Sequence, residues 1–138
     1  MKIQQTQVQQ DRTKTLTEFR KDGKVNLRYG VEYRLTGMAV TSDNRLLICN
    51  CLSNDPNVYI YKDYRTYEDE ISFTSPPCRI TVVPCTDKAV VTIPDEKSIQ
   101  FINTTNNTKD KKIKIGDCDG VTAVKDNICI GVYNKLLF

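Results

Sequence analysis

The side chains in this sequence that could carry out chemistry are carboxylates in two clusters, Glu68-Asp69-Glu70 and Asp95-Glu96. Paired carboxylates hydrolyse glycosidic bonds when two of them flank the scissile bond. Both clusters fall in segments that we predict to be turns between strands, where charged side chains are normally solvated. The chain contains no histidine, which excludes a Ser-His-Asp triad and a histidine general base. We therefore predict that the protein is not an enzyme.

The cysteines could instead form disulfides or bind zinc, and there are six of them: Cys49, Cys51, Cys78, Cys85, Cys118 and Cys129. Cys49 and Cys51 share one face of a predicted strand, which is poor geometry for a disulfide between them. A zinc site needs closely spaced cysteine pairs or added histidine, and the chain has one CxC and no CxxC. We expect free thiols buried in strands.

Two short motifs suggest a ligand or a modification. Asp117-Cys118-Asp119-Gly120 resembles the start of a calcium loop, but the alternating ligands do not continue to a distal glutamate, so a turn explains it better. Asn103 and Asn106 begin glycosylation acceptor sequences on a predicted polar loop. The N-terminal residues lack the apolar core of a secretory signal. We therefore predict a cytoplasmic protein with unmodified asparagines and with no metal or cofactor.

The overall composition gives little further indication of function. The 138 residues suffice for one ordinary domain. Twenty basic residues are balanced by 17 acidic ones, a net charge of +3 that implies neither nucleic acid nor an acidic membrane as a partner. No apolar run approaches the 18 or so residues of a membrane span.

The N-terminal region has two predicted parts. Residues 1–12 are polar and rich in glutamine, and we predict a disordered tail. Residues 13–30 alternate weakly around Asp22-Gly23, a dipeptide that favours a β-hairpin turn. A helix over residues 4–20 is the alternative, but no sustained helical spacing supports it.

Four short strands are predicted between Leu35 and Ser75, separated by turn-forming residues. The apolar and β-branched runs that predict them are Leu35 to Val40, Arg45 to Asn50, Asn57 to Lys62 and Glu70 to Thr74. Polar segments at 41–44, 52–56 and 63–69 separate these runs.

The same four-strand pattern then recurs. Ile80 follows Met38 by 42 residues, and Val121 follows Ile80 by 41. Ile113-Lys114-Ile115 likewise follows Ile71-Ser72-Phe73 by 42 residues. A four-strand repeat of 40–45 residues is typical of β-propeller blades, in which neighbouring sheets pack face to face.

We therefore predict an all-β fold, a partial β-propeller of about three four-stranded antiparallel blades over residues 13–138. Two blades span about 36–75 and 79–116, while 13–30 and 120–138 contribute parts of a preceding and a following blade. Propellers usually close with four to eight blades. The chain could be a fragment, assemble with other copies, or leave its ends open, and we favour a partial product. Self-association through the open blade faces is expected if they stay uncovered.

The repeated segments TGMAVTSDNRLLICN, ITVVPCTDKAVVT and GVTAVKDNICIGVYNK resemble the NHL-like propeller region of tripartite-motif proteins, especially their mollusc relatives. The resemblance covers about residues 35–135, and the absence of tryptophan argues against a WD-type propeller. It implies a recognition platform for a protein partner or, in some members, RNA. In complete members a RING finger supplies ubiquitin-ligase activity, and the sequence has no such zinc spacing. The chain would thus be the substrate-recognition part of such a ligase.

Loop and strand-end residues are the candidates for contacting a protein partner, because propeller ligands usually meet the loops at one end. We select Arg45, Asn54, Asp55, Tyr64, Arg65, Tyr67 and Arg79, with Tyr64 and Tyr67 assigned to a loop at 63–69. Tyr59 and Tyr61 are expected to pack between blades instead. The segment KDKKIK offers a possible RNA contact through Lys109, Lys111, Lys112 and Lys114. An ordinary exposed strand is the competing explanation for that segment.

Overall fold

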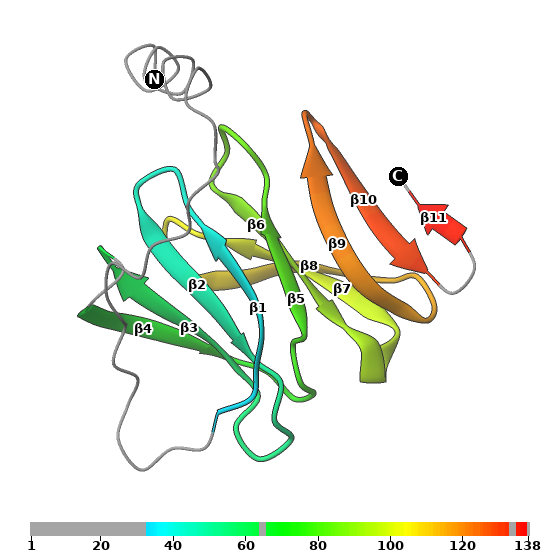
Figure 1. Cartoon of the computed structure of the whole chain (residues 1–138), viewed down its shortest axis with the longest axis horizontal. Coiled ribbons are helices and arrows are strands. Elements are labelled where there is room, and N and C mark those ends of the chain that lie inside the picture. Colours follow the sequence, from blue (N-terminus) through cyan, green and yellow to red (C-terminus); the bar gives the residue numbers. More distant parts are fainter. Residues whose placement is uncertain (1–32, 64–65, 133–134, 138) are drawn as a thin grey trace, which may run out of the picture.

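The computed structural model describes residues 33–63, 66–132 and 135–137, which form three antiparallel β-sheets packed in a row (Figure 1). The predicted tail at 1–12 and hairpin at 13–30 lie outside these residues, as do Tyr64 and Arg65. Among the described residues, no helix is long and apolar enough to cross a membrane.

The first sheet has the strand order β1-β2-β3-β4 and contains β1 (Leu35–Val40), β2 (Arg45–Asn50), β3 (Asn57–Lys62) and β4 (Thr66–Ser72). The predicted bounds of β1, β2 and β3 are confirmed. The predicted turn at 63–69 is wrong from Thr66 onward, because β4 begins there and pairs with Lys62. Glu68, Asp69 and Glu70 therefore lie in an edge strand, where one side of the ladder faces solvent and charges are tolerated.

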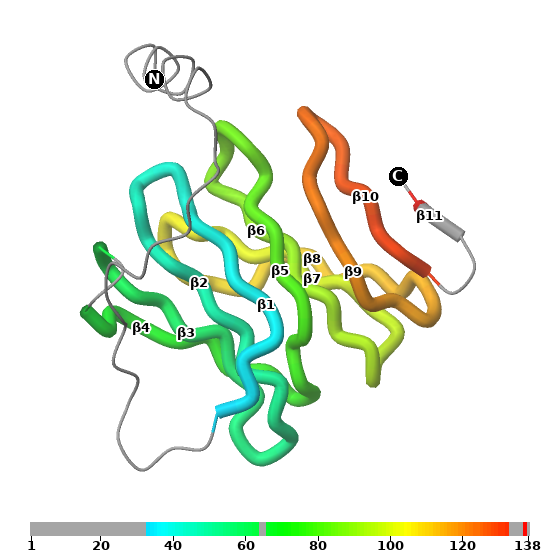
Figure 2. The backbone as a smooth tube through the Cα atoms, viewed as in Figure 1, coloured from blue at the N-terminus to red at the C-terminus, as the bar shows by residue number. Residues whose placement is uncertain are grey.

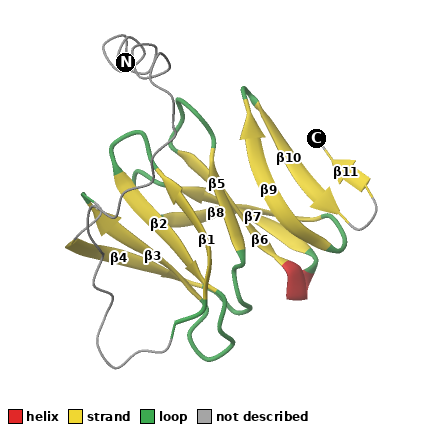
Figure 3. Ribbon diagram, in the orientation of Figure 1, coloured by secondary structure: helices red, strands yellow, loops and turns green. Residues whose placement is uncertain are grey.

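The second sheet repeats this topology. Its strands are β5 (Arg79–Val82), β6 (Lys88–Ile93), β7 (Ser98–Asn103) and β8 (Thr108–Lys114), in the order β5-β6-β7-β8. A single 3₁₀ turn at Pro94–Glu96 joins β6 to β7 and is the helical segment coloured red in Figure 3. Asp95-Glu96 therefore lies in a turn, as predicted.

The third sheet contains β9 (Cys118–Val124), β10 (Asn127–Val132) and β11 (Lys135–Leu137), in the order β11-β10-β9. Strands β1, β5 and β9 are each the first strand of their sheet, and they lie side by side along the row (Figure 2). The sheets are thus arranged as consecutive blades around a common inner edge, the arrangement that the repeat predicts.

The core lies between the sheets. Leu47, Cys49 and Ile60 of the first sheet pack against a cluster from the second that includes Ile80 and Val91. Alternate residues of the second sheet, such as Val90 and Ile99, pack against the third. The second sheet is therefore apolar on both faces, which explains the nearly continuous apolar runs of its sequence. Tyr59 and Tyr61 are fully buried, but on the opposite face of the first sheet, with Ile48.

The cysteines depart from the prediction of free thiols in strands. Cys51 and Cys78 form a disulfide with a Cα–Cα distance of 5.2 Å, and both lie in loops, just after β2 and just before β5. Cys85 is free but exposed in a turn. Cys49 and Cys118 are free, buried thiols in strands, as expected, and burial raises the pKa of Cys49 to about 12.

Candidate interaction surface

The residues selected from the sequence do not form one patch. In Figure 1 the turns at 41–44, 83–87 and 125–126 lie at the upper end of the blades, and the loops at 51–56, 73–78, 94–97 and 115–117 lie at the lower end. The turn at 104–107 contacts Arg45 beside the first of the upper turns. Arg45 begins β2 near the upper end, whereas Asn54, Asp55 and Arg79 belong to the lower end. The structure thus separates the predicted surface into two groups at opposite ends of the strands.

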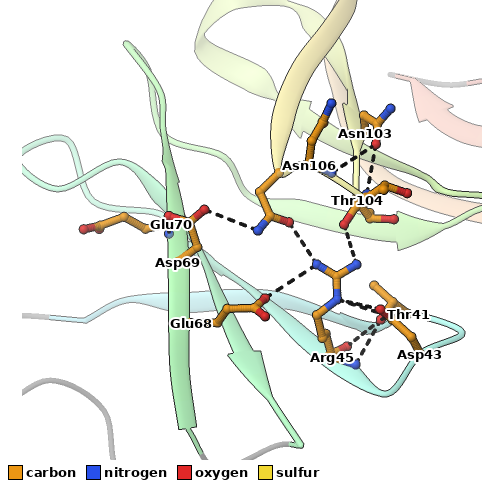
Figure 4. A network of polar contacts seen from close by, with 11 residues as sticks. Thr41, Asp43, Arg45, Glu68, Asp69, Glu70, Asn103, Thr104 and Asn106 are labelled. Atoms are coloured by element: carbon orange, nitrogen blue, oxygen red, sulfur yellow. Dashed lines mark hydrogen bonds and ion pairs between the residues drawn. The ribbon is translucent and has the colours of Figure 1, made fainter.

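Arg45 joins the first two sheets rather than facing solvent, and its side chain is only 11% exposed. Its Nε donates to both carboxylate oxygens of Asp43 at 3.0 and 3.1 Å. Its Nη1 donates to Asn107 Oδ1 at 3.0 Å, and its Nη2 donates to the backbone carbonyl of Thr104. Glu68 completes an ion pair at 3.6 Å (Figure 4). The guanidinium therefore links the first two blades, and we call this set of contacts the Arg45 clamp. All three of its nitrogens bind groups within the chain.

Neighbouring side chains reinforce this clamp. Asn107 donates from Nδ2 to Asp69 at 3.3 Å, so β4 contacts the β7–β8 turn of the next sheet. Thr41 donates to Asp43, and this bond, followed by the contact with Arg45, holds the pKa of Asp43 below its usual value. A polar hollow of about 280 Å³ beside the clamp is lined partly by Asp43 and Cys85.

Asp55 is likewise a structural residue. Its carboxylate accepts from Asn50 Nδ2 at 3.2 Å, from Asn57 Nδ2 and from the hydroxyl of Tyr59. Burial and the bond to Asp55 raise the pKa of Tyr59 to about 12. Since these bonds fix the 51–56 loop to β2 and β3, Asn54 is the selected residue in that loop that remains exposed.

Tyr67 lies in strand β4, not in a loop as predicted. Its ring packs edge-on against Tyr61 with centroids 6.0 Å apart, and its hydroxyl donates to Glu70 at 3.1 Å. Tyr67 is 39% exposed and lies on β4, the outer edge strand of the first sheet, away from the inner strands.

Arg79 and Asp119 occupy the lower end of the neighbouring inner strands β5 and β9. Arg79 Nε lies 3.5 Å from Asp119 Oδ1, and the two side chains remain 47% and 74% exposed. Arg79 also donates to the carbonyl of Thr36 on β1. Beneath the pair, the buried hydroxyl of Thr92 accepts from the Arg79 amide and donates to the Asp119 carbonyl, at 3.1 and 2.9 Å. The pair is therefore held in place while its charges stay accessible.

The sequence analysis assigned Asp119 to a turn and did not select it as a contact residue. The repeat could have indicated this position, since Gly120, the residue after Asp119, stands 41 residues after Arg79 and is its equivalent on the next inner strand. Lys97 and Asp117 form a second exposed pair at 3.7 Å on the same end. Charges of both signs therefore line the lower end of the second and third sheets.

The lysines of β8 are only partly available. Lys109 donates to the carbonyl of Ser72 at 2.9 Å and lies 5.3 Å from the centre of the Phe73 ring. Lys112 pairs with Glu96 at 2.7 Å, which lowers the pKa of that carboxyl. Lys111 and Lys114 are exposed.

Within the described ranges, no group of three or more Cys, Asp or Glu side chains could hold a metal ion.

Comparison with known proteins supports the fold. No family model and no curated protein matches the sequence. The crystal structure of Kluyvelomyces marxianus Hsv2, a β-propeller, superposes with a TM-score of 0.51 over 73% of this chain, at 8% sequence identity. The chain is a partial β-propeller. It spans 31% of the length of Hsv2, and at this identity the likeness concerns architecture alone.

Proposed function

We propose that this partial propeller is a non-catalytic interaction module that binds a protein partner at its lower end, around Arg79 and Asp119. The observation that carries the proposal is the exposed ion pair between these residues, fixed from below by buried Thr92. An ordered but accessible arginine is typical of the residues that dominate protein interfaces. The pair bridges two inner strands, so a partner seated on it would contact two blades at once.

The upper end supports this function less well. The guanidinium of Arg45 already contacts Asp43, Glu68, Thr104 and Asn107, so a partner could reach it only by breaking contacts between blades. The mixed charges at the lower end instead favour a partner surface with charges of both signs in a complementary order. Such complementarity confers specificity and accelerates association.

The sequence resemblance to tripartite-motif proteins extends the proposal. The chain would serve as the substrate-recognition part of a ubiquitin ligase, with catalysis supplied by a RING finger elsewhere in such an assembly. The blade-like stacking and the repeated TGMAV-type segments support this assignment.

RNA is the alternative partner, and the four lysines of β8 are the observation in its favour. Lys109 and Lys112 are occupied by contacts within the chain, which reduces the charge available for phosphates. Filter binding at several salt concentrations would test this alternative, since phosphate contacts make affinity fall steeply with salt. Salt-dependent binding that is lost in a Lys111→Glu/Lys114→Glu variant would favour RNA over protein.

Affinity capture from the source tissue tests the protein-binding proposal. The wild-type chain is compared with Arg79→Glu, Asp119→Lys and the double variant, and Lys88→Glu, at an exposed position of the upper end, is the matched surface control. We expect both single variants to lose a partner that the wild type and the control retain. The double variant restores an ion pair within the chain but inverts its direction, so it should fold normally and still fail to bind. Equal capture by all the variants would overturn the proposal.

A further inference from the structure

We propose that the disulfide between Cys51 and Cys78 is a reversible redox switch that controls how firmly the lower end of the first two blades is held. The bond joins the loop after β2 to the loop before β5, with a Cα–Cα distance of 5.2 Å. Cys78 directly precedes Arg79, at the centre of the proposed binding surface. Because a partner at Arg79 would sense the change, the regulatory part of the proposal rests on the proposed function.

The other four cysteines of the chain are free thiols. Cys49 and Cys118 are buried, Cys129 is half-buried, and Cys85 is exposed in a turn at the upper end. Chains that rely on disulfides in oxidising compartments usually pair their cysteines densely, whereas disulfides in reducing compartments are mostly transient and redox-sensing. Four free thiols beside one disulfide fit the second case.

The bond is accessible to a thiol reductant such as glutathione, because both cysteines are only half-buried and lie in loops. A glutathione thiolate attacks one sulfur, so that a mixed disulfide forms and the other cysteine is released and takes up a proton. A second glutathione attacks the mixed disulfide and leaves as oxidised glutathione. Two electrons and two protons thus pass to Cys51 and Cys78, and oxidised glutathione restores the bond by the reverse steps.

Cys78 binds the same residues that position Arg79. The Cys78 amide donates to the carbonyl of Thr92 at 3.0 Å, and the Arg79 amide donates to the Thr92 hydroxyl at 3.1 Å. The Cys78 carbonyl accepts from the hydroxyl of Thr36 at 2.7 Å, and the Arg79 guanidinium donates to the Thr36 carbonyl. A Cβ at Gly37 would lie 2.8 Å from the Cys78 carbonyl oxygen, so the two segments are in close contact. A constraint on Cys78 is therefore transmitted directly to Arg79.

The two ends of the disulfide differ in how they are otherwise held. The Cys51 amide donates to the carbonyl of Arg34 at 2.8 Å, which fixes this residue beside β1 without the disulfide. Cys78 follows Pro76-Pro77, and neither proline has an amide hydrogen to donate. Opening the bond should therefore loosen the residues around Cys78 more than those around Cys51. The Arg45 clamp lies at the opposite end of the blades, so it keeps the first two sheets stacked in the reduced chain.

Redox titration of the full chain in mixtures of reduced and oxidised glutathione tests whether the bond cycles. Free thiols are alkylated and counted by mass spectrometry at each ratio. We expect four modified thiols under oxidising conditions and six under reducing ones, with the same curve in both directions and its midpoint within the ratios found in cells. Cys85→Ser is the control and should lower each count by one without moving the midpoint. A pair that stays bonded, or stays reduced, at every ratio would overturn the proposal.

Hydrogen exchange tests the coupling to Arg79 without any partner. We expect the amides of Cys78 and Arg79 to exchange severalfold faster in the reduced chain, because their bonds to Thr92 open more often, while the amides of β3 keep their rates. The Cys51→Ser/Cys78→Ser variant should resemble the reduced wild type in either buffer, and circular dichroism would verify that both are folded. Equal exchange in the two redox states would contradict the switch.

Capture of a partner separates failure of the switch from failure of the proposed function. A partner that depends on Arg79 and Asp119 should bind the oxidised chain about three- to tenfold more tightly, because the reduced chain must order the Arg79 side chain again on binding. Equal affinity for the two redox states would refute the regulation while leaving the binding function intact. Capture of no partner in either state would refute the proposed function, and the titration and the exchange rates would still decide whether the disulfide is a switch.

Discussion

The guanidinium of Arg45 donates to the backbone carbonyl of Thr104, so a side chain from the first sheet caps a turn of the second. The two residues are 59 positions apart in the sequence, and their contact exists only when the blades stack. The bond is therefore one of the contacts that hold the two sheets together.

Replacing Arg45 with methionine should lower the free energy of unfolding by about 1–3 kcal/mol, because the backbone carbonyl of the buried Thr104 loses its donor. Urea denaturation followed by circular dichroism would measure the loss. Arg79→Met is the matched control, and its half-exposed ion pair should contribute less than about 1 kcal/mol. Equal effects of the two substitutions would contradict the assignment of Arg45 as a clamp.

Gly37→Ala should destabilise the fold by about 1–3 kcal/mol, the usual cost of overpacking. Its Cβ would meet the carbonyl oxygen of Cys78 at 2.8 Å and the Cα of Arg79 at 2.9 Å, and backbone cannot move aside as a flexible side chain can. Gly131→Ala is the control, since its Cβ would make ordinary contacts at 3.8 Å. Thermal unfolding should separate the two variants clearly. A Gly37→Ala chain as stable as the Gly131→Ala chain would show that β1 and β5 are less closely packed.

The strands that the sequence predicted best are those with a clear apolar pattern. Strands β1, β2 and β3 have the predicted bounds because their apolar runs are flanked by turn-forming residues. The start of β4 was missed because Glu68 and Asp69 sit on a solvated edge, where no alternation is required. The repeat predicted the stacking of sheets because an equal period places equivalent apolar faces on successive blades.

The roles of the candidate site residues were harder to predict, because they depend on which side chains meet between blades. An arginine that begins a strand, as Arg45 does, looks solvent-exposed in sequence, and its partners at 104 and 107 cannot be inferred from local pattern. Asp55 has the composition of an ordinary loop residue, yet it accepts a bond from the buried Tyr59. Asp119 was overlooked because the fixed Arg79 beside it belongs to another blade.

The stability of the fold should fall at high pH through Tyr59. Burial, together with the bond to Asp55, raises the pKa of this tyrosine from about 10 to about 12. The folded state therefore holds the phenolic proton more tightly than the unfolded state does. This contribution is fully present below pH 10 and is lost as the pH rises from 10 through 12.

Absorbance at alkaline pH would follow this titration. We expect Tyr59 to ionise near pH 12 in the folded protein, and this phase should be missing from the Tyr59→Phe variant. The Phe variant keeps the ring in the core, so it separates the loss of the hydroxyl from the loss of packing. A single transition near the ordinary tyrosine pKa, unchanged by the substitution, would contradict the predicted shift.

The disulfide between Cys51 and Cys78 should contribute about 3 kcal/mol by restricting the unfolded chain, because it closes a loop with a sequence separation of 27. The Cys51→Ser/Cys78→Ser variant should unfold at lower urea concentration by a corresponding amount. Cys85→Ser is the control, since its exposed thiol is free and its replacement should change the stability little.

Thiol counting tests the same bond directly. The native protein, unfolded without reductant, should show four reactive thiols, and peptide mapping should link residues 51 and 78. Disulfides persist mainly in oxidising compartments and are rare in the cytosol. Counting the thiols of protein isolated from its source, with thiols blocked during lysis, would therefore also show whether its compartment is oxidising or reducing. Six reactive thiols in that material would mean that the pair is reduced in the cell, and the serine variant should then match the stability of the native chain.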